Sequence, residues 1–396
     1  MKPLIRPVLI TLVVVLFCGG QPFLFAQSWV QTSAPTNFWY SIASSADGGK
    51  IVAVNNGANG QSIWTSTNSG ATWTPIDTLF GELTFVASSA DGASLTVLSP
   101  SQPVFTSTDA GNTWLQAAPG NDLEPWSCVA ASADGTNLFV TSIGASNPPS
   151  IYASTNSGTL WTTTSAPNEF WHTVACSADG TKVIAGESSY LVGGSVYLSA
   201  DSGKKWVQAN LPGGHWNCVA SSADGTRLAA AAYGGLIYVS TNSGSVWTVA
   251  SSSSSFWSSL ASSADGTRLA AAGPGLILTS EDSGATWTSN NLPALQWNSV
   301  ALSADGHKLV ATAYNAGIYR LQTTSTPLFS ISASARGLLL SWVVPSQNFI
   351  LQQNSDLGST NWTNVGATAV LNLKSLSEEV TITAPNGRMF YRLSAQ

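Results

Sequence analysis

The 396-residue chain is poor in charge. Asp, Glu, Lys and Arg together make up 9% of its residues, whereas a soluble domain usually has about a quarter. Lys and Arg number 14 against 20 Asp and Glu, which leaves a net charge of −6. Nucleic acid binding needs clustered cations that displace counterions, so this composition excludes nucleic acid as a partner. Ser, Thr, Asn and Gly must cover the surface instead.

Long apolar runs are also scarce. The longest lies at residues 8–17 and is too short to span a bilayer, and no later segment is apolar enough to do so. Because Lys2 and Arg6 precede it, the run is typical of a signal peptide. The sequence therefore predicts cleavage after Ala26, secretion, and a mature chain without a membrane span. Lipidation of Cys18 is the alternative.

Cysteine is equally limited. Removal of the leader leaves Cys128, Cys176 and Cys218, an odd number that excludes a fully paired disulfide framework. We expect small buried thiols at these positions. A phosphate loop, zinc-type Cys and His spacing and a nucleophile elbow are all missing from the sequence. The sequence therefore predicts no metal, no cofactor and no catalytic residues of these classes.

The sequence is rich in internal repeats. The string Ser-Ala-Asp-Gly occurs seven times, at spacings of 40 to 45 residues, and an Asp-Gly pair between apolar runs is a strong hairpin signal. The Asp residues are Asp47, Asp91, Asp134, Asp179, Asp224, Asp265 and Asp305.

A second motif, Ser-x-Asp/Asn-x-Gly-x-x-Trp, follows six of these strings. The Asp or Asn side chain can bond backbone amides across a turn, Gly supplies positive φ, and Trp anchors the turn in apolar packing. We therefore assign these residues a structural role. They are Asn68, Gly70, Trp73, Asp109, Gly111, Trp114, Asn156, Gly158, Trp161, Asp201, Gly203, Trp206, Asn242, Gly244, Trp247, Asp282, Gly284 and Trp287.

The second motif resembles the Asp box of the BNR-repeat family, known from sialidases, sortilin-type receptors and photosystem II assembly-factor propellers. The resemblance covers residues 28–322. Each repeat reads as four short strands, so the predicted fold is all-β, a seven-bladed β-propeller. No Asp box follows the seventh Ser-Ala-Asp-Gly string, whereas residues 28–31 match residues 205–208. We therefore expect the N-terminal strand to close the last blade.

The sequence divides into a signal peptide at 1–26, the propeller at 27–322, a linker at 323–327 and a C-terminal module at 328–396. The module looks like the small immunoglobulin- or fibronectin-like β-sandwich that ends many secreted bacterial proteins. We expect it to act as a stalk, spacer or sorting module, with ligand binding as the alternative. The Thr- and Ser-rich linker suggests that the two domains move semi-independently.

The two faces of such a propeller differ. The Asp-Gly turns and Asp boxes share one, the turn face, while the loops between the second and third strands and between blades share the other, the loop face. The turn face is monotonous, so we expect function on the variable loop face. Its candidate ligand-binding residues are Glu82, Asp122, Glu124, Glu169, His172, His215, Trp126, Trp171 and Trp216.

These side chains leave several interpretations open. The carboxylates could form an acid–base pair of a glycosidase, bind a cation, or simply hydrate the face. The Trp residues that begin the first strand of six blades could stack on sugars or pack between blades. The sequence argues against a sialidase, because that family needs three arginines that clamp a carboxylate. The mature propeller has only Arg227, Arg268 and Arg320, and the first two follow Asp-Gly turns.

The predicted function is therefore a secreted, non-catalytic scaffold that binds a protein or a carbohydrate on its loop face. An Asp-box glycoside hydrolase or lyase that uses the loop-face carboxylates is the second hypothesis. A purely structural surface protein is the third.

Overall fold

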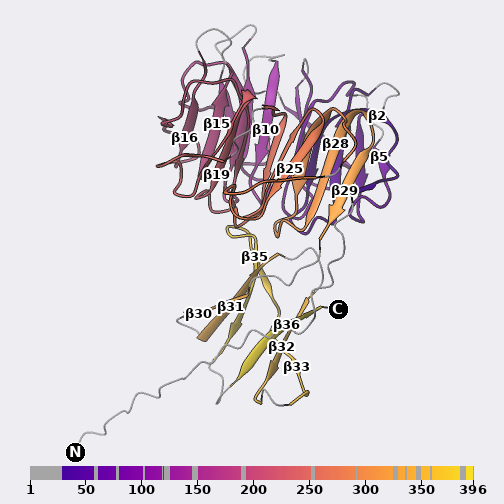
Figure 1. Cartoon of the computed structure of the whole chain (residues 1–396), viewed down its shortest axis with the longest axis vertical. Coiled ribbons are helices and arrows are strands. Elements are labelled where there is room, and N and C mark those ends of the chain that lie inside the picture. Colours follow the sequence, from indigo (N-terminus) through magenta and orange to yellow (C-terminus); the bar gives the residue numbers. More distant parts are fainter. Residues whose placement is uncertain are drawn as a thin grey trace, which may run out of the picture.

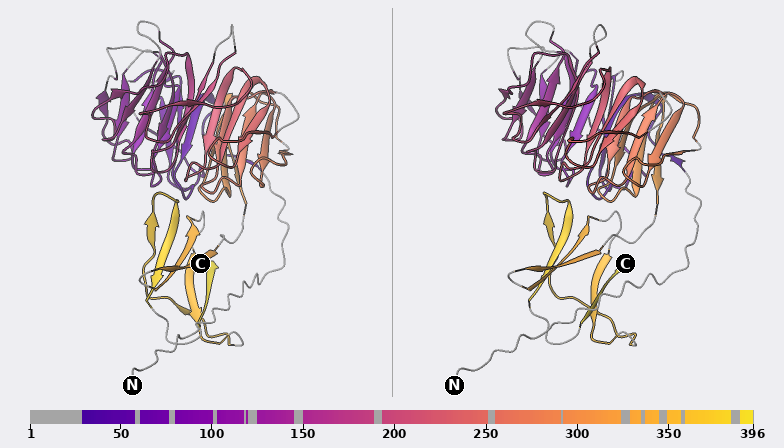
Figure 2. Two further views of the ribbon diagram at one scale, coloured as in Figure 1. Left: turned by 90° about the vertical axis from the view of Figure 1, so that its left-hand side faces the viewer. Right: turned by 60° about the vertical axis from the view of Figure 1, so that its left-hand side comes forward.

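A computed structural model of the chain describes residues 29–395, except 58–60, 77–79, 101–102, 118, 120–124, 145–149, 189–192, 251–254, 291, 324–328, 335–336, 345–348, 357–358 and 384–388. Every helix or strand element in these described ranges is a β-strand, as the sequence predicts. Figures 1 and 2 show a wide body of sheets arranged around a central axis and a smaller body beneath one of its faces.

The wide body consists of antiparallel quartets of short strands that follow one another along the chain. Their bounds are β2 Asn37–Ser44, β3 Ile51–Asn55, β4 Ile63–Ser66 and β5 Thr74–Ile76; β6 Phe85–Ser88, β7 Leu95–Leu98, β8 Val104–Ser107 and β9 Leu115–Ala117; β10 Trp126–Ala131, β11 Leu138–Ser142, β12 Ile151–Ser154 and β13 Thr162–Thr163; β14 Trp171–Cys176, β15 Val183–Glu187, β16 Val196–Ser199 and β17 Val207–Gln208; β18 Trp216–Ser221, β19 Leu228–Gly235, β20 Ile237–Ser240 and β21 Thr248–Val249; β23 Ser259–Ser262, β24 Leu269–Gly273, β25 Leu276–Ser280 and β26 Thr288–Ser289. A two-residue strand, β22 Ser255–Phe256, pairs with the end of β19.

The last quartet combines both ends of the wide body. It contains β27 Trp297–Leu302, β28 Lys308–Ala316, β29 Ile318–Gln322 and β1 Val30–Gln31. In β1, Val30 pairs with Arg320 and Gln31 pairs with Tyr319. The N-terminal strand therefore completes the last sheet, as predicted, and the pairing covers an edge that would otherwise be exposed. The tip of β28 also pairs with the start of β2, which joins the last quartet to the first.

The Ser-Ala-Asp-Gly turns are bonded to one another around the axis. The amide of Ala46 donates to the carbonyl of Ala90 at 2.7 Å, and each later Ala donates to the next in the same way. Ala304 donates back to Ala46 at 2.7 Å, so the hydrogen bonds form a closed ring. The ring consists of Ala46, Ala90, Ala133, Ala178, Ala223, Ala264 and Ala304.

The Asp-box turns share one hydrogen-bond pattern, which the first of them illustrates. Ser66 Oγ donates to Asn68 Oδ1 at 2.9 Å and accepts from the amide of Gly70 at 2.9 Å. Ser69 lies between them in the left-handed region at φ 56°. Its amide donates to the carbonyl of Gly49 at 2.9 Å, next to the Asp-Gly turn of the same quartet. Both kinds of turn therefore lie on one face, as predicted.

Large apolar side chains fill the space between quartets. A Trp at or near the start of the first strand is buried in six quartets, and in the remaining quartet a buried Leu takes its place. These residues are at most 5% exposed: Trp39, Leu83, Trp126, Trp171, Trp216, Trp257 and Trp297. Trp171, for example, packs in one cluster with Phe139 and Ile151 of the preceding quartet. Truncating a buried residue of this size costs about 3–5 kcal/mol.

The smaller body has two sheets. One contains β30 Phe329–Ser334, β31 Gly337–Val343, β35 Ser377–Ile382 and β34 Val370–Asn372; the other contains β33 Thr363–Asn364, β32 Phe349–Asn354 and β36 Phe390–Ala395. Leu340 and Val380 from the first sheet and Leu351 and Tyr391 from the second form a shared core with Trp342. The smaller body therefore has a hydrophobic core of its own.

The smaller body contacts the turn face at the axis. Val344 belongs to the buried cluster of the ring alanines, and the partly buried Leu376 packs against this cluster. The loop before β35 reaches this face in Figure 1. The amide of Val344 donates to the carbonyl of Leu376 at 2.8 Å, which holds the two contact residues together. The structure thus adds a contact between the two bodies that the composition of the linker does not predict.

We predict that Leu376→Asp separates the two bodies. A carboxylate at this position would have to lose its hydration against the alanine ring, which costs several kcal/mol, while each body keeps its own core. Small-angle X-ray scattering should show a larger radius of gyration, with the β-sheet circular dichroism spectrum unchanged. Leu373→Asp is the matched control, because Leu373 is 37% exposed on the same loop. Identical scattering from the two variants would contradict the contact.

Candidate functional site

A cavity of about 340 Å³ lies on the axis at the loop-face end of the first strands. Its polar lining bonds neighbouring quartets together: Asn217 Nδ2 donates to the carbonyl of Trp257 at 2.6 Å, and Asn298 Nδ2 donates to that of Trp39 at 2.9 Å. A second cavity of about 160 Å³ lies within the alanine ring and is capped by Leu376. The larger cavity is therefore reached from the loop face.

Of the two predicted histidines, one lies at this cavity and the other lies close enough to act on its charge. His172 lines it, and burial lowers the pKa of His172, with a further decrease from the nearby His215 and an opposing hydrogen bond from Asn217. Burial also lowers the pKa of His215, whose Nδ1 lies 2.9 Å from Ser188 Oγ. Both imidazoles are therefore neutral at pH 7, because their pKa values lie below the ordinary value of 6.5. They can donate and accept hydrogen bonds, but they contribute no positive charge.

Glu82 is exposed at the same mouth, next to two phenols. Burial raises the pKa of Tyr40 to about 12, with further contributions from the hydrogen bond and charge of Glu82 and from Tyr314. Tyr40 lines the cavity, and its ring centroid lies 6.0 Å from that of Tyr314. Glu82 and the two tyrosines therefore form one cluster. Tyr40 comes from β2, Tyr314 from β28 and Glu82 from the connection between β5 and β6.

Glu169 has a partner that the sequence analysis did not identify, Glu187. Glu187 is 6% exposed, at the end of β15, and its carboxylate accepts a hydrogen bond from the amide of Ser195 at 3.0 Å. Burial raises the pKa of Glu187, and the charge and hydrogen bond of Glu169 raise it further. Glu187 lies opposite Trp171 in the sheet, where the other quartets have neutral residues such as Asn55 and Ser142. A charged residue at a position that is neutral in these other quartets is the sequence feature that could have identified Glu187.

The remaining predicted site residues fall into two groups. Asp122 and Glu124 lie outside the described residues. Trp126, Trp171 and Trp216 are at most 5% exposed, so their ring faces are covered by protein and cannot stack on a sugar. Their burial favours the packing interpretation over the ligand-binding one.

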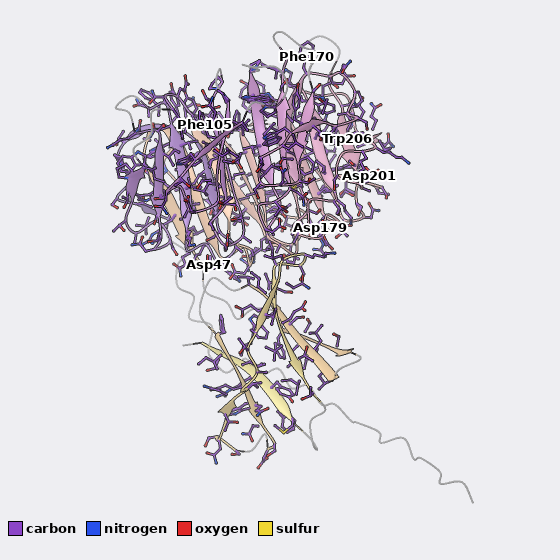
Figure 3. The ribbon with its side chains drawn as sticks, turned by 180° about the vertical axis from the view of Figure 1, so that it is seen from behind. Asp47, Phe105, Phe170, Asp179, Asp201 and Trp206 are labelled. Carbon is purple, nitrogen blue, oxygen red and sulfur yellow. The ribbon has the colours of Figure 1, made fainter. Side chains whose placement is uncertain are left out.

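Other aromatic side chains are exposed on the loop face. Tyr233 is 50% exposed, Phe256 53%, Phe170 55% and Tyr314 42%. Figure 3 shows Phe170 at the rim opposite Asp47 and Asp179 of the turn face. Tyr233 and Phe256 contact each other with ring centroids 4.8 Å apart. The sequence analysis missed these residues because they do not recur in every repeat, unlike the tryptophans on which it relied.

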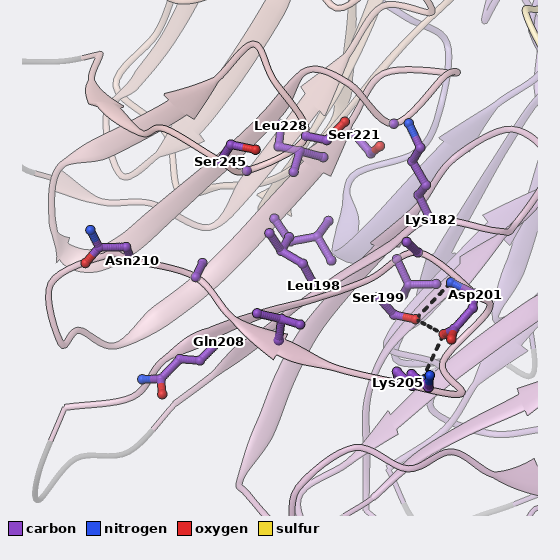
Figure 4. A pocket seen from close by; sticks show the side chains of 18 residues that line it. Lys182, Leu198, Ser199, Asp201, Lys205, Gln208, Asn210, Ser221, Leu228 and Ser245 are labelled. Atoms are coloured by element: carbon purple, nitrogen blue, oxygen red, sulfur yellow. Dashed lines mark hydrogen bonds between the residues drawn. The ribbon is translucent and has the colours of Figure 1, made fainter.

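A groove of about 530 Å³ separates the quartets β14–β17 and β18–β21 toward the turn face (Figure 4). Leu198 and Leu228 line it. Its charged groups are engaged within the fold: Asp201 Oδ1 accepts from the amide of Lys205 at 2.8 Å, and Lys182 Nζ donates to a backbone carbonyl at 2.8 Å. Among the described residues that line it, this groove therefore has apolar walls, and two of its charged groups, Asp201 and Lys182, are already hydrogen-bonded within the fold.

The cysteines carry no disulfide among the described residues. Burial raises the pKa of the Cys128, Cys176 and Cys218 thiols, so they are protonated and unreactive at neutral pH. Within the described ranges, no group of three or more His, Cys, Asp or Glu is arranged to hold a metal ion. None of the described residues forms a helix with the length and hydropathy of a membrane span.

No protein-family model and no curated protein matches the chain. Among solved structures, it is similar to YCF48 bound to a D1 peptide, with 18% identity, a TM-score of 0.56, and coverage of 75% of this chain and 97% of that one. It is also similar to U3-55K, with 12% identity, a TM-score of 0.61 and coverage of 74% and 98%. The β-propeller domain of Cps50 (Swd1) from Myceliophteria thermophila has 10% identity, a TM-score of 0.59 and coverage of 75% and 100%. Identities this low show the fold alone, and the fold is a β-propeller.

We predict that Glu187→Gln stabilises the protein above, but not below, the ordinary Glu pKa of 4.5. The folded-state pKa of Glu187 is raised, so its stabilising contribution is complete below 4.5 and is lost as pH rises through the folded-state pKa. Gln remains neutral and can still accept from Ser195. Thermal unfolding followed by circular dichroism should show a gain that grows from about pH 4 to about pH 8. A gain independent of pH would contradict the assignment.

Proposed function

We propose that this chain is a secreted, non-catalytic binding scaffold that engages a protein or carbohydrate ligand on its loop face. The observation that carries the proposal is that residues departing from the repeat gather at one place. Tyr40, Glu82, His172 and Tyr314 surround the same cavity mouth, and exposed aromatic side chains lie on the same face. Binding residues on loops held by a rigid frame are common in proteins.

The proposal includes a seven-bladed Asp-box propeller. The closed ring of alanine hydrogen bonds contains one residue from each quartet, which supports this blade count. In every one of the six boxes, the Ser hydroxyl bonds the Asp or Asn side chain and the Gly amide, as in Ser107, Asp109 and Gly111. This common geometry supports the Asp-box assignment. The two sheets of the smaller body, with four and three strands, support an immunoglobulin-like sandwich.

A non-catalytic role fits the geometry of the carboxylates better than glycoside hydrolysis does. Glycosidases need two carboxyl groups about 5–10 Å apart on opposite sides of the scissile bond. Glu187 is instead 6% exposed, and its carboxylate accepts a hydrogen bond from the amide of Ser195 at 3.0 Å, so it is covered by the fold rather than open to a sugar. Glu82 belongs to a different connection and is bonded to Tyr40.

A protein ligand is further supported by a protein of similar fold. YCF48 has been solved bound to a D1 peptide, so a β-propeller of similar fold can bind a peptide. The low identity transfers neither that peptide nor its binding residues to this chain.

We predict that the mature chain binds ligands without releasing sugar from them. Glycan and peptide arrays should give binding that Tyr233→Ser and Phe256→Ser weaken, because each removes an exposed aromatic contact of the loop face. Lys205→Ser on the turn face is the control and should bind normally. Chromatographic analysis of the supernatant should detect no released sugar. Sugar release, or binding weakened only by Lys205→Ser, would contradict the proposal.

The proposed secretion predicts a specific mature terminus. Expression with the native leader in a bacterial host should yield an exported chain that begins at Gln27, because the apolar run and its preceding cations direct cleavage after Ala26. Intact-mass spectrometry and N-terminal sequencing measure this directly. A chain that begins at Cys18 and carries acyl mass would establish the lipoprotein alternative, and an uncleaved cytoplasmic chain would contradict secretion.

A further inference from the structure

The cationic side chains of the propeller are gathered on the turn face. Lys50 Nζ donates to the carbonyl of Asp91, and Arg320 donates to that of Ser69. Lys182, Lys308, Arg227 and Arg268 likewise contact Asp-Gly turns or Asp boxes, while Lys204 and Lys205 belong to a box. In the sequence, no connection between β1 and β29 that lies on the loop face contains Lys or Arg.

The loop face therefore has a defined electrostatic character. Glu82 and Glu169 lie on it, and Glu187 lies at the end of a strand beneath it. The ion pair that the described residues form, between Arg268 and Glu281 at 3.0 Å, lies on the opposite face. Since His172 and His215 are neutral at pH 7, the field at the cavity mouth is negative and favours the approach of cations.

Three aromatic rings lie together at this mouth, and Glu82 lies beside one of them, Tyr40. The ring centroid of Tyr314 lies 5.0 Å from that of Phe38, with planes 51° apart, and 6.0 Å from that of Tyr40, with planes 58° apart. The three rings therefore form one cluster, and the carboxylate of Glu82 acts on one of its members, Tyr40. A cation over such ring faces is attracted by their quadrupole, and a carboxylate adds a direct charge–charge interaction.

This cluster is held in place by the backbone. Tyr314 pairs with Phe38 in the sheet, and its amide donates to the carbonyl of Gln296 at 2.8 Å. The segment that carries Glu82 is fixed by the amide of Leu83, which donates to a carbonyl of β3 at 3.1 Å. The rings and the carboxylate are therefore preorganised, so little ordering entropy opposes binding.

A second aromatic pair has the same construction on another part of the loop face. Tyr233, at the tip of the β19 hairpin, pairs with Phe256, and its ring centroid lies 6.1 Å from that of His215. Phe170 is exposed on the same face. Contacts spread over several quartets suit an extended ligand better than a single small cation.

We propose that the loop face binds a cationic segment of a protein partner, with one Lys or Arg side chain held between Phe38, Tyr40 and Tyr314 and paired with Glu82. The remaining exposed rings contact neighbouring residues of the segment. This inference rests on the proposed scaffold function and names the chemistry of its ligand. An anionic glycan or acidic peptide would find no cation on this face.

The test is isothermal titration of the mature chain with a capped peptide of alternating lysine and glycine, and with its glutamate counterpart. The lysine peptide should bind, more weakly as salt is raised, and the glutamate peptide should not bind. Glu82→Gln and Tyr314→Leu should each weaken binding about tenfold. Tyr314→Leu keeps the bulk of the exposed side chain, and thermal unfolding of both variants checks that they fold.

Glu281→Gln is the matched control, because it removes the same charge on the turn face and should leave the affinity unchanged. If Glu82→Gln and Glu281→Gln lowered the affinity for the lysine peptide equally, net charge alone would explain the loss, and the proposed site would be overturned. Equal binding of the two peptides, or no binding of the lysine peptide, would also overturn it. If arrays still detected a loop-face ligand in that case, the scaffold function would stand and only its cationic ligand would be rejected.

Discussion

The hydrogen bonds that run from alanine to alanine around the axis constrain the whole propeller. Each link requires both neighbouring turns, and the last one, from Ala304 to Ala46, forms only when the two ends of the chain meet. The ring demands small side chains, because the alanines share one buried cluster at the axis. It also demands glycine beside them: Gly225 has a φ of +64°, and a Cβ there would lie 2.6 Å from the side chain of Lys182.

Lys side chains that cross these glycines place positive charge on the turn face. Lys50 crosses Gly92, and Lys182 crosses Gly225, and each ends on the carbonyl of the next Asp-Gly turn. The cations thus hold neighbouring sheets together on the turn face. A chain with few Lys and Arg that uses them in this way leaves none for the loop face. The negative character of the loop face therefore follows from the way the quartets are joined.

The repeated features could be predicted from the sequence, whereas those that occur once could not. The turns, the quartets and the closing strand follow from motifs present in several copies, and Val30 pairs with Arg320 as the repeat implies. The tryptophans were ambiguous because a periodic aromatic residue suits both packing and stacking, and only burial distinguishes the two. Leu376 gave no signal, since a contact between remote segments leaves no local pattern. Glu187 was hidden because it ends an otherwise apolar strand.

The proposed binding at the loop face would therefore depend on features that the repeat does not require. The hairpins of β19 and β28 are longer than the second strands of the other quartets, and their tips carry Tyr233 and Tyr314. Each tip turns through a residue with positive φ, Gly234 or Asn315, and each pairs with the residue in front of the next buried Trp. The other quartets join their neighbours without such an extension, so the repeat itself does not require one. An exposed aromatic side chain on a hairpin with its own backbone partner loses little entropy on binding, so these two hairpins have the properties of rigid recognition elements.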